Sequence, residues 1–293
     1  MTSSLRAFML NLIDYAGLFP PAGLDMETAV KNFASYHSGP HAEFLGRFIT
    51  PFDRLDEFEA AAASFEERGE ISADHPWQIS ALIKEEAYED SIDRLENFED
   101  EHDHRLIVAS IETKTDDVNF LDEVCDTLSP AITPYYELAL DRDYRGFITA
   151  MGNSDSSAKI RTGGLTADLF PSVESLAQFL HHAAVNRVYF KATAGLHHPA
   201  RHRNEKIGVT EHGFLNVFGA GVAAIAHKLT ADEIQAILEI EDPREFKFTE
   251  DEFEVAGWKM STGQIIEARR YAVSFGSCSF DEPVDALREL GWL

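Results

Sequence analysis

Two short segments of this 293-residue chain carry the side chains best suited to covalent chemistry. The segment KIRTGG contains Lys159 and Arg161, and the segment FKATAG contains Lys191 and Thr193. Residues two apart on a β-strand share a face, so each pair is expected to point into the same space. A lysine near other cations can lose its proton close to neutral pH and attack a carbonyl carbon. These residues therefore predict an enzyme with Lys159 as nucleophile, and with Lys191 and Arg161 lowering the pKa of Lys159.

Carboxylates are expected at the same place. The same alternation, applied to the other apolar runs, puts Glu112, Glu137 and Asp14 near strand ends. Glu137 is the predicted general acid or base. Glu112 has two interpretations, a salt bridge that closes the end of the fold or a catalytic group, and the salt bridge is the preferred one.

A basic segment, HHPARHRNEK, follows the second lysine in an otherwise acidic chain. Its side chains His197, His198, Arg201 and Arg203 are predicted to bind an anionic group of the substrate, a carboxylate or a phosphate. The segment is expected to lead into a helix N-terminus near Thr210–His212, which also favours anions. The alternative is a surface loop whose charge is balanced by acidic neighbours.

The histidines of this region also suggest a metal site. His197, His198, His202 and His212 match no standard zinc signature, and adjacent residues of an extended segment point to opposite sides. We therefore predict no bound metal and no cofactor. A metal-assisted hydrolase or isomerase that uses the His197–His212 loop and Glu137 stays open as an alternative. Cys278 has no base beside it in the sequence and is interpreted as structural.

Strands that alternate with helices must position these groups. The expected strands are Met9–Asp14, Leu45–Thr50, Gln78–Ile83, Leu106–Glu112, Ile132–Ala139, Ala158–Arg161, Phe190–Thr193 and, as the eighth, Phe253–Met260. The expected helices are Asp25–Tyr36, Leu55–Arg68, Tyr88–Asp100, Val118–Leu128, Asp143–Met151, Ser172–Asn186, Glu211–Leu229, Thr262–Ser274 and a C-terminal amphipathic helix. This alternation is typical of parallel βαβ units.

The fold predicted from this pattern is a (β/α)8 barrel, formed by one domain over residues 1–293. Strand ends recur about every 30 residues, as in barrels of ~250 residues whose catalytic groups lie at the C-terminal ends of the strands. An open, doubly wound sheet has the same local pattern and remains the alternative. No GxGxxG segment follows an expected strand, which disfavours a dinucleotide-binding fold.

The composition limits the partners. The chain has 51 acidic and 25 basic residues and a formal net charge of -26, so its surface repels nucleic acids and anionic membranes. No segment approaches the ~20 apolar residues that cross a bilayer, and no cleavage-site pattern follows the N-terminus, so a cytoplasmic location is expected. The two cysteines are far apart in sequence and are expected to be reduced thiols. The expected partner is a small anionic metabolite, and the oligomeric state is open.

Several longer segments resemble a family of bacterial proteins without an assigned activity. They are DYAGLFPPAG, KIRTGG, FKATAGLHHP, HGFLNVF and FGSCSFDEPVDALRELG, and together they extend over nearly the whole chain. This resemblance implies common ancestry and a common fold, but no function.

A weaker resemblance concerns mechanism. Lys159 and Lys191, on the expected strands six and seven, resemble the paired lysines of class I aldolases of the deoxyribose-phosphate aldolase group. The resemblance implies that Lys159 forms the Schiff base and that Lys191 lowers its pKa. The aldolase segment KTSTGF differs here, because Arg161 replaces a small residue and Gly164 replaces the aromatic one. The predicted function is an enzyme of the lyase type that acts on a small anionic carbonyl or phosphorylated metabolite. A non-catalytic binder of such a metabolite is a further alternative.

Overall fold

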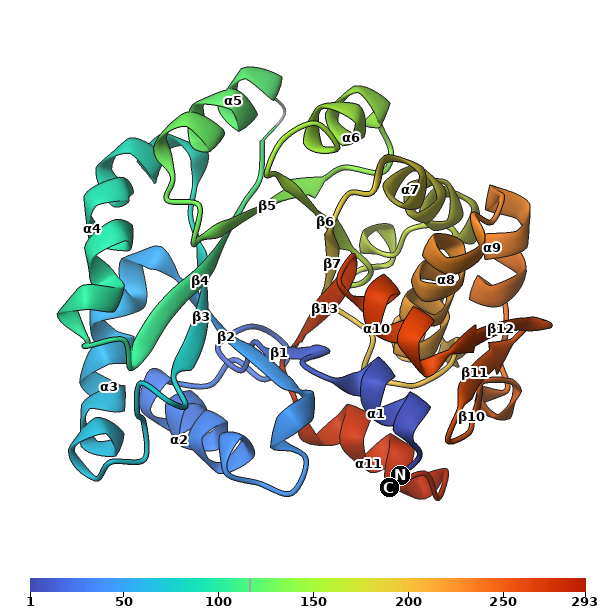
Figure 1. The fold of residues 1–293 in the computed structure, drawn as a ribbon, viewed down its shortest axis with the longest axis horizontal. Helices are drawn as coiled ribbons and strands as arrows, with labels where there is room; N and C mark the ends of the chain where they lie inside the picture. Colours follow the sequence, from blue (N-terminus) through green and yellow to red (C-terminus); the bar gives the residue numbers. More distant parts are fainter. Residues whose placement is uncertain (116) are drawn as a thin grey trace.

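Eight parallel strands close into a barrel, which confirms the predicted (β/α)8 fold and excludes the open sheet. The computed structural model describes residues 1–115 and 117–293. The strands follow one another around the barrel in the order β1-β13-β7-β6-β5-β4-β3-β2 (Figure 1). Their bounds are β1 Ile13–Tyr15, β2 Leu45–Pro51, β3 Trp77–Leu82, β4 Leu106–Thr113, β5 Thr133–Leu138, β6 Ser157–Arg161, β7 Phe190–Thr193 and β13 Ala272–Ser277.

Helices surround the strands on the outside of the barrel (Figure 1). Those that follow the barrel strands are α2 Met26–His37, α3 Leu55–Glu67, α4 Tyr88–Glu101, α5 Val118–Thr127, α6 Arg145–Met151, α7 Val173–Asn186, α8 Phe214–His227 and α11 Asp281–Glu289. Several begin at a side-chain cap that accepts a backbone N–H of the first turn, such as Asp25 for α2 and Ser172 for α7. Helix α7 ends at Arg187, which has a positive φ of 55°.

The position predicted for the eighth strand is wrong. Phe253–Met260 forms an antiparallel hairpin outside the barrel, made of β11 (Glu252–Val255) and β12 (Trp258–Ser261). The chain reverses at Ala256 and Gly257, which both have positive φ (48° and 82°). The eighth barrel strand is β13, whose residues were expected to be helical in part. Helix α10 (Thr262–Arg269) ends earlier than predicted.

The first strand is also shorter than predicted. Met9 belongs to helix α1 (Ser3–Met9), which is capped at its N-terminus by Thr2, whose side chain accepts the N–H of Leu5. Leu5, Phe8 and Met9 form the buried face of this helix. Over a few residues, the apolar positions of a short amphipathic helix and those of a short strand form similar patterns. The sequence therefore did not separate α1 from β1.

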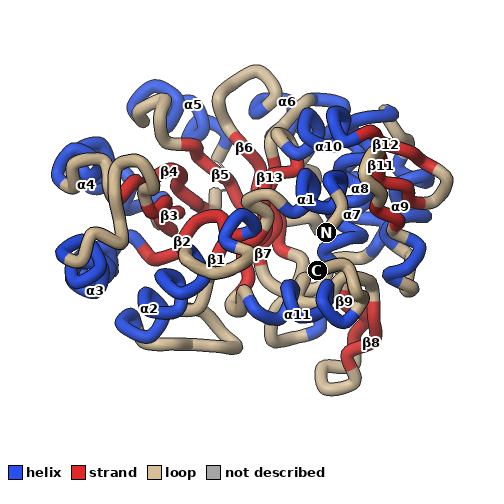
Figure 2. Tube along the Cα trace, turned by 60° about the horizontal axis from the view of Figure 1, so that its bottom comes forward, coloured by secondary structure: helices blue, strands red, loops and turns tan. Residues whose placement is uncertain are grey.

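Additional elements lie beside the barrel. The hairpin β11–β12 is extended by β10 (Lys247–Phe248), and α9 (Ala231–Leu238) precedes it. The predicted basic loop contains β8 (His202–Asn204), which pairs with β9 (Val209–Glu211) in a hairpin that projects from the body (Figure 2). Helix α8 therefore begins after β9, at Phe214, later than expected. Short 3-10 turns in the described part of the chain are η1 Ala42–Phe44, η2 Phe52–Arg54, η3 Glu85–Ala87, η4 Ala167–Leu169 and η5 Pro243–Glu245.

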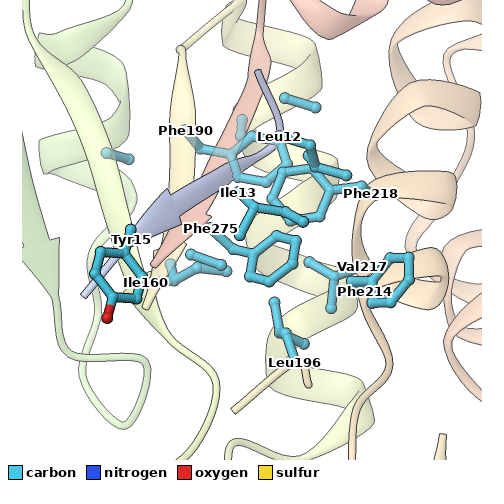
Figure 3. Close-up of a cluster of buried hydrophobic side chains, with 14 of the residues drawn as sticks. Leu12, Ile13, Tyr15, Ile160, Phe190, Leu196, Phe214, Val217, Phe218 and Phe275 are labelled. Atoms are coloured by element: carbon cyan, nitrogen blue, oxygen red, sulfur yellow. The ribbon is translucent and has the colours of Figure 1, made fainter. Parts of the chain in front are cut away.

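Apolar residues fill the space between the barrel and its helices. Phe190 of β7 and Phe275 of β13 face α8, where Phe218 stacks on Phe190 and lies beside Phe275 at centroid distances of 5.8 Å each (Figure 3). Because strand residues alternate, the neighbours of these aromatic residues point into the barrel. Lys191 and Ser274 are such neighbours, which is how the fold directs polar side chains inward.

No helix among residues 1–115 and 117–293 is long and apolar enough to cross a membrane. The assignment of the whole chain to one domain stays a prediction.

Candidate functional site

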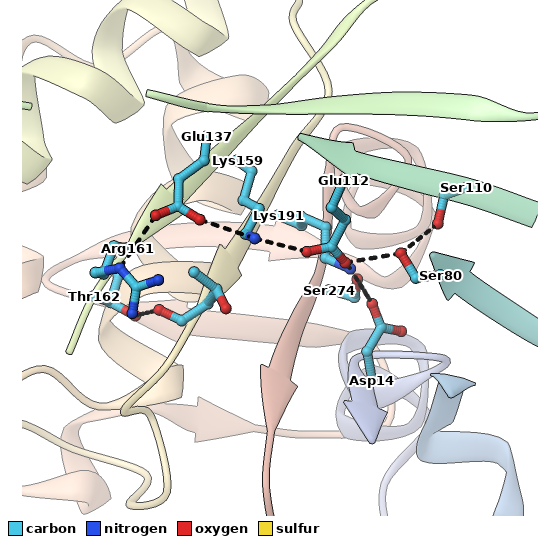
Figure 4. A network of polar contacts seen from close by, with 11 residues as sticks. Asp14, Ser80, Ser110, Glu112, Glu137, Lys159, Arg161, Thr162, Lys191 and Ser274 are labelled. Carbon is cyan, nitrogen blue, oxygen red and sulfur yellow. Dashed lines mark hydrogen bonds and ion pairs between the residues drawn. The ribbon is translucent and has the colours of Figure 1, made fainter. Parts of the chain in front are cut away.

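A row of alternating charges runs through the barrel interior toward the C-terminal ends of the strands, here called the mouth (Figure 4). We call the six side chains that carry these charges the charge network. In order they are Asp14 of β1, Lys191 of β7, Glu112 of β4, Lys159 of β6, Glu137 of β5 and Arg161 of β6. The structure thus joins all the strand residues singled out as catalytic.

The inner half of the network is sealed from solvent. Lys191 Nζ lies 2.7 Å from Asp14 Oδ2 and 2.5 Å from Glu112 Oε1, and all three side chains are at most 1% exposed. The Oγ of Ser274 donates to Asp14 Oδ2 at 2.7 Å, and that of Ser80 donates to Glu112 Oε1 at 2.8 Å. Each serine therefore gives a second donor to a carboxylate oxygen that already accepts from Lys191, which favours burial of these charges.

The outer half of the network reaches the mouth. Lys159 Nζ lies 2.8 Å from Glu112 Oε2 and 2.9 Å from Glu137 Oε2. Glu137 Oε1 in turn accepts the Nε–H of Arg161 at 3.1 Å. Exposure of the side chains rises outward, from 6% for Lys159 through 13% for Glu137 to 40% for Arg161. A molecule that enters from the mouth therefore meets Arg161 first. Of the two lysines, Lys159 is the more exposed and the nearer to the mouth.

The expectation of a lowered lysine pKa is wrong for the free protein. Burial by itself lowers the pKa of Lys159, but Glu112 and Glu137 outweigh it and raise that pKa above its usual range. Burial also lowers the pKa of Lys191, and Asp14 and Glu112 likewise outweigh it. The prediction failed because a carboxylate lies between each pair of cations: Glu112 separates the lysines, and Glu137 separates Lys159 from Arg161.

The carboxylates shift in the complementary direction. Burial raises the pKa of Glu137, but Lys159 and Arg161 more than compensate, so its pKa lies below the usual value. Glu112, between two lysines, has its pKa lowered further despite complete burial. Glu112 therefore has the salt-bridge role that the sequence favoured, but in the centre of the barrel.

Strand register and close backbone packing hold the two lysine segments together. Lys159 pairs with Lys191, and Arg161 with Thr193, across the β6–β7 contact. Beyond the strands, a Cβ on Gly163 would lie 3.0 Å from the Cα of Gly195, so this approach requires glycine. Thr193 therefore lies beside Arg161 at the mouth, as predicted.

His197 and His198 contact different groups, although they do not extend strand β7, which ends at Thr193 and is followed by three residues with positive φ. His197 Nδ1 lies 2.7 Å from Glu282 Oε2, and its Nε2 lies 3.9 Å from the Sγ of Cys278. His198 packs on His202 with ring centroids 4.1 Å apart. That His197 lies beside Cys278 could not be predicted from local patterns, because 81 residues separate the two. Burial raises the pKa of the Cys278 thiol.

The two arginines of the basic segment lie apart from the charge network. Arg203 is exposed on the projecting β8–β9 hairpin, and Arg201 Nε lies 4.0 Å from Glu241 Oε1, beyond α9. The expected helix N-terminus at Thr210–His212 is absent, because Thr210 belongs to β9 and α8 begins at Phe214. Within the described chain, no ion pair or hydrogen bond joins either arginine to the network.

The candidate metal ligands are distributed over separate places. His212 is buried and its Nε2 contacts the Pro171 carbonyl at 2.9 Å, whereas His198 packs on His202 and His197 contacts Glu282. In residues 1–115 and 117–293, no three His, Cys, Asp or Glu side chains are grouped so as to hold a metal ion.

Sequence reasoning missed the serines that support the carboxylates. Ser80, Ser110 and Ser274 are fully buried, and Ser110 Oγ donates to Ser80 Oγ at 2.8 Å. Their signal was present in the sequence, since each serine stands between two apolar residues of a strand, at a position of the same alternation that directs the charged residues inward.

Comparisons with known proteins add no assignment. No protein-family model matches the chain, and a search of curated proteins gives no match.

Proposed function

We propose that this protein is an enzyme that acts on a small anionic carbonyl compound at the mouth of the barrel, through a Schiff base formed by Lys159. The observation that carries the proposal is the position of Lys159 between two carboxylates, with Arg161 on the outer one. Lys191 is excluded as the nucleophile because its side chain is completely buried.

The raised pKa of Lys159 requires a trigger that removes its proton. An anionic group of the substrate competes with Glu137 for Arg161, the most exposed member of the network. Glu137 then loses one of the two cations that hold its pKa down, while it stays largely buried. Its pKa rises, and it accepts the proton of Lys159 Nζ across 2.9 Å. The substrate itself thereby generates the neutral amine.

The chemistry that follows balances within the network. The Lys159 amine attacks the carbonyl carbon, a C–N bond forms, and the carbonyl oxygen takes the proton that Glu137 holds. Glu137 takes the amine proton of this carbinolamine and passes it to the hydroxyl group, which leaves as water, so the product is the protonated imine. The imine draws electrons from the bond between the α- and β-carbons. An enamine then stays on Lys159, and the β-hydroxyl, whose proton Glu137 accepts, becomes the carbonyl of the leaving fragment. Cleavage of this carbon–carbon bond is the reaction of a class I lyase.

Trapping with borohydride tests the proposal. The protein is incubated with glyoxylate as an anionic carbonyl probe, reduced, digested and mapped by mass spectrometry. Label is expected at Lys159 and is lost in Lys159→Met. Lys228, which follows α8, is the control position: Lys228→Met is expected to label like the wild type.

Label distributed over surface lysines with no preference for Lys159, across the tested pH range, would overturn the Schiff-base proposal. Binding of the probe without any trapped adduct would instead favour the non-catalytic binder.

A further inference from the structure

A second cationic site lies at the opposite end of the barrel from the mouth. A cavity of about 620 Å³ opens where β1, β2, β3 and β13 begin. Three arginines and two histidines line it, and none of its fifteen lining residues is acidic. The cationic lining residues are His37, Arg47, His75, Arg269 and Arg270. This lining stands out in a chain with twice as many acidic as basic residues.

Arg47 has donor capacity that the protein leaves unused. It lines this cavity and a second cavity of about 380 Å³, which Tyr135 also lines. Its Nε is shielded from solvent and has no hydrogen-bond partner among the described residues. A buried guanidinium N–H without an acceptor is unfavourable, so an acceptor that enters the cavity is stabilised there.

The charges of the two inner arginines are compensated differently. Burial lowers the pKa of Arg47, but Tyr135, Asp14 and Glu112 outweigh it and raise that pKa above its usual range. Arg269 donates to the backbone carbonyls of Phe8, Leu10 and Val273. Within residues 1–115 and 117–293, neither Arg47 nor Arg269 has a carboxylate within ion-pair distance. Burial lowers the pKa of Arg269 to about 9, which indicates that its charge is poorly compensated.

We infer that this cavity binds a small anion, the phosphate or carboxylate group of a metabolite, with Arg47 and Arg270 as its direct ligands. Arg47 supplies the shielded donor. Arg270, which is exposed at the rim and also pairs with Glu267 at 3.4 Å, supplies a second guanidinium on the approach from solvent. Arg269 contributes its charge, since its three nitrogens already donate to the backbone. Guanidinium forks match both phosphate and carboxylate oxygens.

Calorimetric titration at low salt tests the inference, with inorganic phosphate in one series and succinate in the other. Arg47→Gln is the main variant. The Arg47 backbone N–H, which donates to Asp14 Oδ1 at 2.8 Å, is unaffected by this change. Arg270→Gln is a second variant. Because the Arg270 side chain is exposed, this change is expected to leave folding intact. Arg161→Gln is the matched control at the mouth.

At least one of the two anions is expected to bind, with affinity reduced about tenfold or more in Arg47→Gln and in Arg270→Gln. The site should persist in Arg161→Gln, even if binding at the mouth is lost. The anion that responds identifies the chemical class of the ligand. Isotherms for both anions that are the same in wild type and in folded Arg47→Gln and Arg270→Gln would overturn the inference, whatever the outcome at Lys159.

Discussion

Lys159 Nζ lies 2.9 Å from Glu137 Oε2, and this ion pair is the boundary between the sealed interior of the barrel and its mouth. On its inner side the charges are compensated without solvent, by Glu112, Lys191 and Asp14. On its outer side Glu137 depends on Arg161, which is partly exposed. A ligand that reaches Arg161 therefore changes the environment of the proton shared between Lys159 and Glu137.

Arg161→Met is expected to affect neutral and anionic carbonyl probes in opposite ways. Without Arg161 the pKa of Glu137 rises, so Lys159 gives up its proton more easily and trapping of acetaldehyde shifts to lower pH. Trapping of glyoxylate weakens by about 10- to 100-fold, because a charge-assisted bond worth ~1.5–3 kcal/mol is lost. Rates of borohydride trapping against pH measure both effects. Arg203→Met is the control and should change neither; parallel losses for both probes in Arg161→Met would contradict the trigger.

Lys191→Met is expected to destabilise the fold strongly. The substitution leaves Asp14 and Glu112 buried without their shared cation, and breaking a buried ion pair costs ~3–5 kcal/mol. Urea denaturation followed by circular dichroism measures the loss. Lys247→Met is the matched control, because Lys247 pairs with Glu254 on the surface at 3.0 Å and its loss should cost at most ~1 kcal/mol. Equal losses in the two variants would show that the inner network contributes little.

Stability should fall on acidification, in part because of Glu112. Its pKa is lower in the folded protein than in the unfolded chain, so its contribution is complete above about pH 4.5. The contribution is lost as pH falls from there toward the folded-state pKa, because the unfolded chain then binds more protons. In Glu112→Gln the stability at neutral pH should be lower and its decline below pH 4.5 less steep. Denaturation midpoints between about pH 3 and 7 provide the test, and identical slopes would refute this assignment.

Gly46→Ala should disturb the network without changing any charge. A Cβ at Gly46 would clash with Asp14 Oδ1, so the carboxylate that Lys191 and Ser274 hold must shift. Such overpacking costs ~1–3 kcal/mol. Gly146→Ala in α6 is the control, because its Cβ would have no atom within 4 Å, and it should stabilise the protein by up to ~1 kcal/mol. Thermal unfolding compares the two, and a neutral Gly46→Ala would mean that Asp14 can relocate freely.

The sequence by itself determined the properties that depend on short stretches of chain. Period-two alternation put Lys159 with Arg161, and Lys191 with Thr193, on shared strand faces, and the repeated strand–helix pattern gave the barrel. Local patterns failed where two elements look alike over a few residues. The hairpin at Ala256 was mistaken for a barrel strand because alternation does not distinguish a hairpin strand from a barrel strand.

Only the tertiary structure decided which charges touch. Closure of the barrel brings Asp14 against Lys191 across 177 positions of the chain, and Glu112 between the two lysines. The direction of the lysine pKa shifts follows from these placements, because Coulomb energy depends on distances between groups and not on their order in the chain. The same residue types that suggested a lowered pKa give a raised one, since each cation meets a carboxylate before it meets another cation. The cationic cavity around Arg47 has the same origin, because its lining comes from strand beginnings that are far apart in sequence.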